Sequence, residues 1–93
     1  MIVDIEQVLK ERNGRYGGFY ENARLSQGLK HQIRSYHTPE LDGMCSEHRE
    51  AIEMILHKIS RIVCGDAHYT DSWVDIQGYA KLGEDACVTK AKE

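Results

Sequence analysis

The segment from Ser46 to Cys64 carries the most regular apolar pattern in this chain of 93 residues. Its apolar side chains recur every three or four positions, at Ile52, Ile55, Leu56, Ile59, Ile62 and Val63. This spacing follows one side of a helix, because an α-helix turns once in about 3.6 residues. Ser46 is a good N-cap, and Gly65 can end the helix. We therefore predict a helix over residues 46–64.

Three further helices are predicted, because strand-like alternation is almost absent from the rest of the chain. They are expected over residues 4–12, 19–34 and 70–84, with a solvated tail over residues 85–93. Asp4 can cap the first helix, and Asn13-Gly14 can stop it, since both residues tolerate left-handed backbone angles. Thr70 or Asp71 can cap the last helix. Residues 35–45 are expected to form an exposed loop.

The predicted fold is therefore all-α: a single domain built as a small four-helix bundle with two long and two shorter helices. A domain of 93 residues buries a limited share of its surface. Helical proteins of this size often gain stability by pairing with copies of themselves. We expect the bundle to be completed by homo-oligomerisation.

Composition and charge exclude several classes of protein. The formal net charge of −3 argues against a general nucleic-acid coat, which requires a basic surface. No apolar run approaches the roughly 20 residues of a membrane span. The N-terminal segment lacks the layout of a secretion signal, so a cytoplasmic protein without membrane contact is expected. Cys45, Cys64 and Cys87 have no CxxC spacing, which favours free thiols over a zinc site or disulfides.

Two carboxylate pairs are the candidate metal ligands. Glu50 and Glu53 are three residues apart in one predicted helix, and Asp71 and Asp75 are four apart in the next, so each pair shares a helix face. If the two helices pack antiparallel, the four carboxylates can converge on Mg²⁺, which prefers oxygen ligands and accompanies phosphate substrates. The alternatives are a solvated charged face for the glutamates, an N-cap role for Asp71 and an ion pair for Asp75 with a nearby cation.

Four residues are candidate nucleotide ligands. Lys58 and Arg61 follow the glutamate pair and could neutralise phosphate oxygens, Arg61 through its planar guanidinium. Arg15 could contact phosphate, and Tyr16 could stack on a base, although a turn with an exposed aromatic residue explains these two residues equally well. Ion pairs of Lys58 and Arg61 with acidic neighbours explain the same residues equally well.

Three segments resemble small phage and prophage proteins of unassigned function. They are residues 9–27 (LKERNGRYGGFYENARLSQ), 47–62 (EHREAIEMILHKISRI) and 66–82 (DAHYTDSWVDIQGYAKL). The chain resembles, more distantly, a nucleotide-modification-associated phage domain and the MazG-like all-α nucleoside triphosphate pyrophosphohydrolases. That resemblance implies a helical bundle, usually dimeric or tetrameric, in which an ExxE pair and an ExxD pair hold Mg²⁺.

The residues agree with the MazG-like pattern in part. Residues 50–53 (EAIE) match ExxE, and Asp75 fits the aspartate of the second pair. Ser72 stands where the second glutamate is expected, and Gly78 stands where such enzymes often have an asparagine. Asp71 could replace the missing glutamate, although it points about 100° away from Ser72 on an ideal helix.

Three functions follow as hypotheses. In the first, Mg²⁺ held by Glu50, Glu53, Asp71 and Asp75 activates a water that attacks a nucleoside triphosphate, with Glu50 or Glu53 accepting the proton and the basic residues stabilising the phosphates. In the second, the metal set is degraded and the chain binds a nucleotide without hydrolysing it, for example to sequester a signalling nucleotide of the host. In the third, the charged helix face binds another protein. The sequence leaves open whether the chain is an enzyme.

Overall fold

The computed structural model describes residues 4–92, with side chains placed as far as residue 87, and all regular structure in that range is helical. The helices are α1 (Ile5–Tyr16), α2 (Phe19–Arg34), α3 (Pro39–Asp42), α4 (Ser46–Cys64) and α5 (Thr70–Lys92). The all-α prediction is thereby confirmed. None of these helices combines the length and the apolar character needed to cross a bilayer.

The observed bounds of α2 and α4 agree with the predicted ranges, whereas those of the other helices differ. α3 is an additional single turn inside the predicted loop, with Thr38 as its N-cap and Pro39 as its first residue. α5 continues to Lys92 instead of ending near residue 84, and its first helical residue is Thr70. The N-cap of α4 is Cys45, so Ser46 is the first residue of that helix rather than its cap.

α1 begins where predicted but ends four residues later. The Asp4 side chain accepts a hydrogen bond from the Gln7 backbone N–H at 3.2 Å, as expected for an N-cap. The helix then continues through Asn13 and Gly14 to Tyr16. It ends at Gly17, whose φ of 81° and ψ of 177° are accessible almost only to glycine. The predicted stop at Asn13-Gly14 was wrong, because these residues disfavour a helix only weakly.

The end of α1 lies against the end of α4. A side chain at Gly17 would collide with the backbone carbonyl of Cys64, and one at Gly65 would collide with the backbone of Arg15 and Tyr16. The Asp66 N–H donates to the Arg15 carbonyl at 2.8 Å. Two glycines and one backbone hydrogen bond therefore fix α1 across the end of the other helices.

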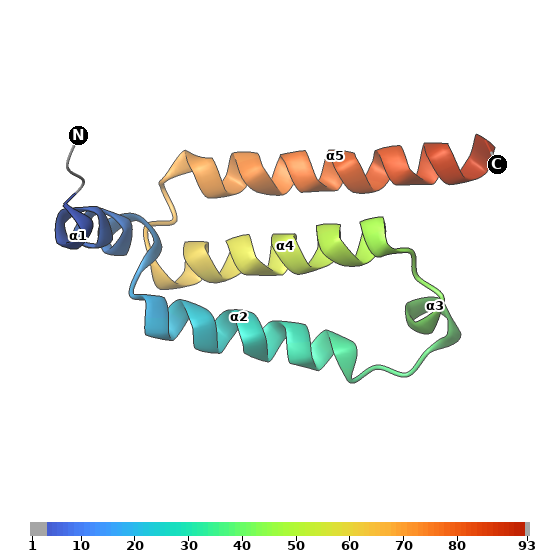
Figure 1. Cartoon of the computed structure of the whole chain (residues 1–93), viewed down its shortest axis with the longest axis horizontal. Coiled ribbons are helices and arrows are strands. Elements are labelled where there is room, and N and C mark those ends of the chain that lie inside the picture. Colours follow the sequence, from blue (N-terminus) through green and yellow to red (C-terminus); the bar gives the residue numbers. More distant parts are fainter. Residues whose placement is uncertain (1–3, 93) are drawn as a thin grey trace.

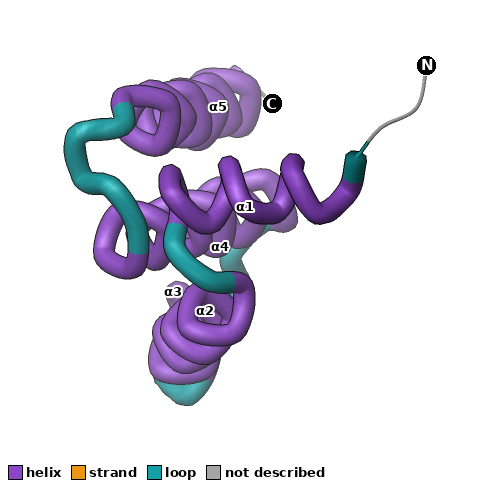
Figure 2. The backbone as a smooth tube through the Cα atoms, turned by 90° about the vertical axis from the view of Figure 1, so that its left-hand side faces the viewer, coloured by secondary structure: helices purple, strands orange, loops and turns teal. Residues whose placement is uncertain are grey.

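The three long helices form a single layer with α4 in the middle. Figure 1 shows α2 and α5 on opposite sides of α4, and in Figure 2 the same three helices are stacked in one column with α1 crossing their end. α2 and α5 both run antiparallel to α4, and α4 also contacts α1. Because the layer is one helix thick, both of its broad faces are open.

The interior of the described chain is correspondingly thin and polar. Ala51 is the one buried apolar residue within residues 4–87, and the most deeply buried side chain is Ser60 at 0% exposure. The α2–α4 contact is polar as well: Ser60 Oγ donates to Asn22 Oδ1 at 3.4 Å. Between α4 and α5, Gly83 allows close packing on Ala51, with 3.7 Å from the Ala51 Cβ to a Cβ built at Gly83. Small side chains therefore let the helices approach closely, and the larger apolar side chains are half-buried or exposed rather than fully buried.

The junction of α1 and α4 yields a stability prediction. Replacement of Gly17 by alanine forces an L-residue into a glycine-only conformation and drives a methyl group into the Cys64 carbonyl. We expect the free energy of unfolding to fall by about 1–3 kcal/mol, measured by urea denaturation. The matched control is Gly14→Ala, where the helical backbone has open space and alanine should stabilise by up to about 1 kcal/mol. Equal effects at the two positions would contradict this account of the junction.

Candidate functional site

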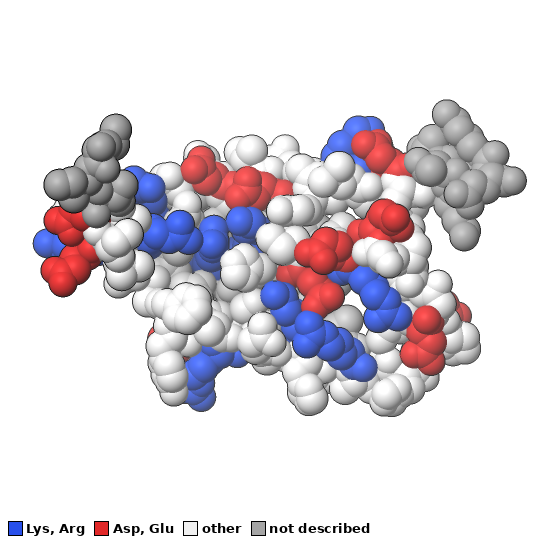
Figure 3. All heavy atoms as spheres, in the orientation of Figure 1, with Lys and Arg blue, Asp and Glu red and all other residues white. Residues whose placement is uncertain are grey.

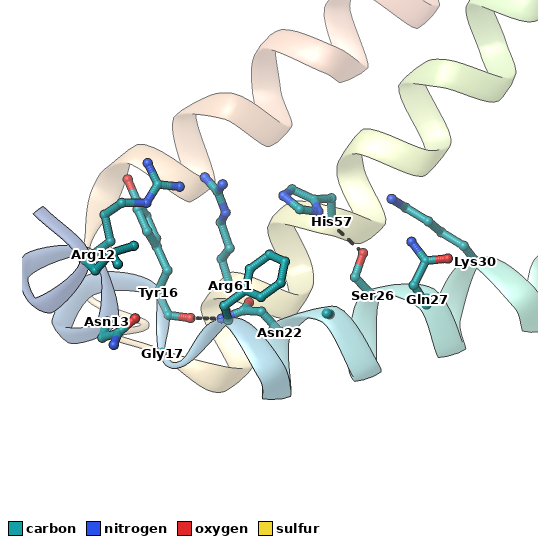
Figure 4. Close-up of a pocket in the computed structure, with 13 residues that line it drawn as sticks. Arg12, Asn13, Tyr16, Gly17, Asn22, Ser26, Gln27, Lys30, His57 and Arg61 are labelled. Atoms are coloured by element: carbon teal, nitrogen blue, oxygen red, sulfur yellow. Dashed lines mark hydrogen bonds between the residues drawn. The ribbon is translucent and has the colours of Figure 1, made fainter. Parts of the chain in front are cut away.

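A cavity with a volume of about 320 Å³ lies where α1 crosses α2 and α4. α1 contributes Leu9, Arg12, Asn13 and Tyr16; Gly17 follows; α2 contributes Phe19, Asn22, Ala23, Ser26, Gln27 and Lys30; α4 contributes His57 and Arg61. Figure 4 shows that the side chains of Arg12, Arg61, His57 and Lys30 point to the same side of the helices. The cavity is therefore a shared product of three helices.

Helical periodicity explains how each helix reaches this cavity. Leu9, Arg12 and Tyr16 are three and four residues apart, so they follow one another along the same side of α1. His57 and Arg61, four apart, do the same on α4. The glycine junction holds the end of α1 against α4, and this contact brings Tyr16 to Arg61.

Two guanidinium groups lie over the ring of Tyr16. The Arg61 guanidinium carbon lies 4.5 Å from the centre of the Tyr16 ring, and that of Arg12 lies 5.5 Å away. Both distances are within the range of cation–π attraction. Tyr69 packs edge-on against Tyr16, with ring centres 5.7 Å apart. The Tyr16 ring thus holds the positive charges of Arg12 and Arg61 at one end of the cavity. Contact with a ring face leaves the N–H donors of both guanidinium groups available to a ligand.

The cavity is positively charged, although the whole chain carries a net charge of −3. Arg12, Lys30 and Arg61 line it, and none of its lining residues is Asp or Glu. Within the described part of the chain, no salt bridge joins any of these three cations to a carboxylate. Unneutralised cations around a concave surface attract anions, and guanidinium groups match carboxylate and phosphate oxygens in particular.

His57 is a neutral hydrogen-bonding group in this cationic setting. Its Nδ1 lies 3.4 Å from Ser26 Oγ. Burial of the imidazole, followed by the positive charges of Arg61, Lys30 and Lys58, lowers the pKa of His57 below its usual value of 6.5. The neutral imidazole therefore dominates at pH 7, and a bound anion would favour its protonation.

Two of the four predicted nucleotide ligands lie in the cavity. Tyr16 and Arg61 line it. Arg15 instead lies over the Tyr69 ring, with 5.4 Å from its guanidinium carbon to the ring centre. Lys58 is nearly buried on the side of α4 that contacts α5, and its Nζ is 3.1 Å from Asp75 Oδ2. The structure therefore separates residues that are close in the sequence.

Three of the four predicted carboxylates have separate partners. Glu53 pairs with Arg34 of α2, and Asp75 pairs with Lys58, as one of the sequence alternatives proposed. Asp71 accepts a hydrogen bond from the Tyr69 hydroxyl at 3.0 Å, which raises the pKa of Tyr69. It lies in the first turn of α5 and is not the cap. Glu50 is exposed.

Within the described residues, the four candidate carboxylates do not surround a common position. Among residues 4–87, no three His, Cys, Asp or Glu side chains gather in a way that could hold one ion. The expected convergence of the four carboxylates is therefore not formed within one copy. Their binding of Mg²⁺ stays a prediction.

Sequence reasoning missed several cavity residues, chiefly Arg12, Lys30 and His57. Arg12 and Tyr16 are four residues apart, so a first helix predicted to continue to Tyr16 would have placed these two side chains on one face. The positions of Lys30 and His57 depend on how α2 packs on α4, for which the sequence offers no local signal.

Fold and site together define an all-α protein with a cationic cavity. The chain belongs to the DUF6378 family, a domain of unknown function, and the family model matches residues 4–87. That match carries no function and no link to phage proteins or to MazG-like pyrophosphohydrolases. No curated protein and no solved structure matches the chain.

The pKa of His57 makes stability depend on pH. Because this pKa is lowered in the folded protein, the unfolded chain binds more protons around and below pH 6.5, and the folded state loses stability as the pH falls from above 6.5 through the folded pKa. We expect this loss to be smaller in His57→Asn than in the unmodified protein, measured by urea denaturation across that pH range. Identical pH profiles for the two proteins would contradict the burial of an uncharged His57.

Proposed function

We propose that this protein binds a nucleotide, or a similar phosphate-bearing small molecule, in the cationic cavity between α1, α2 and α4. The observation that supports the proposal is the convergence of Arg12, Lys30 and Arg61 on a cavity with no acidic lining residue. A phosphate group supplies the missing negative charge, and each charge-assisted hydrogen bond is stronger than a neutral one.

The rest of the lining suits the remainder of a nucleotide. Phe19 is 84% exposed and Tyr16 is partly exposed, so aromatic surface is available for stacking on a base. Asn13 and Gln27 add neutral donors and acceptors beside the cations. The volume of about 320 Å³ falls at the lower end of the range of small-molecule sites, which begins at about 300 Å³.

Binding without hydrolysis is the form of this function that the carboxylate contacts favour. A hydrolase would need Glu50, Glu53, Asp71 and Asp75 to hold Mg²⁺, with a metal-bound water as the nucleophile. Two of these carboxylates already bind cations of the chain, Glu53 to Arg34 and Asp75 to Lys58. The second candidate function is hydrolysis of a nucleoside triphosphate by a magnesium-dependent pyrophosphohydrolase. The third candidate function is binding of another protein by the charged helix face.

The biological setting stays a prediction from the sequence. It comprises a phage or prophage origin, a cytoplasmic location and a homo-oligomeric state. The cavity itself requires none of them.

Loss of one guanidinium should weaken nucleotide binding. We expect Arg61→Gln to lower the affinity for nucleoside triphosphates by about tenfold or more, since a hydrogen bond to a charged group contributes about 1.5–3 kcal/mol. Isothermal titration calorimetry with ATP, GTP, their deoxy forms and pyrophosphate measures the change. Arg15→Gln is the control, because Arg15 lies outside the cavity and should bind within about twofold of the unmodified protein. Equal losses in both variants would place the site elsewhere.

Turnover separates binding from hydrolysis. We expect bound nucleoside triphosphate to remain intact in the presence of Mg²⁺, as followed by chromatography of the nucleotide and by release of pyrophosphate. Asp75→Asn should lower stability, because it leaves Lys58 nearly buried and without its carboxylate, yet keep nucleotide affinity. Pyrophosphate release that requires Mg²⁺ and disappears in Asp75→Asn would favour the hydrolase instead.

A further inference from the structure

The helix layer has two chemically different faces. On α4, residues two apart point about 200° away from each other, so Ile59 lies opposite Arg61 and Ile52 lies opposite Glu50. On α5, Trp73 and Asp75 are separated in the same way. On α4, one face therefore carries the cavity residues and charged side chains, and the opposite face carries isoleucines and Val63.

We define the apolar face by six residues. They are Ile52, Ile55, Ile59 and Val63 of α4, with Trp73 and Ala80 of α5. Ile52, Ile55 and Ala80 line a shallow groove of about 260 Å³ between the two helices. Trp73 precedes Ala80 by seven residues, or about two turns, and so lies on the same side of α5.

The apolar face exposes large side chains that a single copy leaves uncovered. Val63 is 67% exposed, Trp73 49% and Ile59 36%. The Trp73 indole N–H already donates to the Ala67 carbonyl at 2.8 Å, so the residue offers its ring rather than a polar group. Helical domains normally bury such a surface between two packed layers. The described chain supplies only one.

We propose that a second copy of this chain covers the apolar face, so that two layers pack back to back about a twofold axis. A twofold interface pairs a patch with itself, which requires a patch that does not repel its own copy. The six residues of the apolar face are uncharged, whereas the face in Figure 3 carries acidic and basic side chains along its length. The chain measures 48 × 29 × 26 Å along its principal axes, so a broad face of this size can supply the ~800 Å² per partner of a stable interface.

This arrangement keeps each cavity on an outer surface. Arg61 and His57 point away from the apolar face, so pairing does not cover the cationic cavity. Each dimer would present two separate cavities, one from each copy. The proposal does not rest on what those cavities bind.

Two charge-introducing variants test the interface by sedimentation velocity and by light scattering after size-exclusion chromatography. We expect the unmodified protein to be a dimer and both Val63→Lys and Ile59→Lys to shift it to a monomer. Val63 is two-thirds exposed in one copy, so its replacement should not prevent that copy from folding. Leu82→Lys is the matched control: Leu82 is 59% exposed, but lies two turns after Asp75 on the opposite face, and its variant should stay dimeric.

Thermal denaturation provides the second readout. The melting temperature of the unmodified protein should rise over a roughly hundredfold increase in protein concentration, because a dimer is stabilised by mass action. A monomeric unmodified protein with a concentration-independent melting temperature would overturn the proposal. A dimer that Leu82→Lys dissociates and Val63→Lys leaves intact would overturn it as well.

Discussion

The chain can bring α1 across the end of α4 only because Gly17 and Gly65 lack side chains. Any Cβ at either position would enter the backbone of the other segment, and the hydrogen bond from Asp66 N–H to the Arg15 carbonyl closes the junction. This contact sets the direction of α1. The side chain of Tyr16 then meets Arg61, and the two helices enclose the cavity together with α2. A backbone constraint with no chemistry of its own therefore determines where the α1 side chains of the candidate site, Arg12 and Tyr16, lie relative to Arg61.

Charge is distributed over the layer in a way that gives its two faces different roles. On one face, two carboxylates pair with cations of the chain, Asp75 with Lys58 and Glu53 with Arg34. The cations of the cavity have no such partner in the described part of the chain, and this imbalance is the basis of the proposed phosphate binding. On the other face the central helix is apolar, which suits contact with an identical copy. The two opposite faces of α4 thus contribute to two different proposed sites: one face lines the proposed ligand cavity, and the other forms part of the proposed interface.

The sequence predicts local structure here better than it predicts the site. For α4, the apolar periodicity together with the stop at Gly65 predicts a range that agrees with the observed helix, and the predicted range of α2 agrees as well. The predicted helix end at Asn13-Gly14 was wrong, because weak helix formers can remain helical when the next turn makes tertiary contacts. The observed end at Gly17 depends on the Cys64 carbonyl, which leaves no room for a side chain there. Tyr16 and Arg61 were identified from residue type. Lys58 was grouped with Arg61 although it faces α5, because the sequence does not indicate which helix covers which side of α4.

Assigned amide NMR of the nitrogen-15-labelled protein, titrated with ATP, tests the central claim most directly. If the cavity binds the nucleotide, the shifts should change in residues 12–30 and 57–61 and stay small around Glu50 and Asp75. Phosphorus-31 spectra of the same samples should show the phosphate signals moving together with those amides. Saturable shifts confined to Glu50, Asp71 and Asp75, or no shift at any residue with any nucleotide tested, would contradict a cationic binding cavity in this protein.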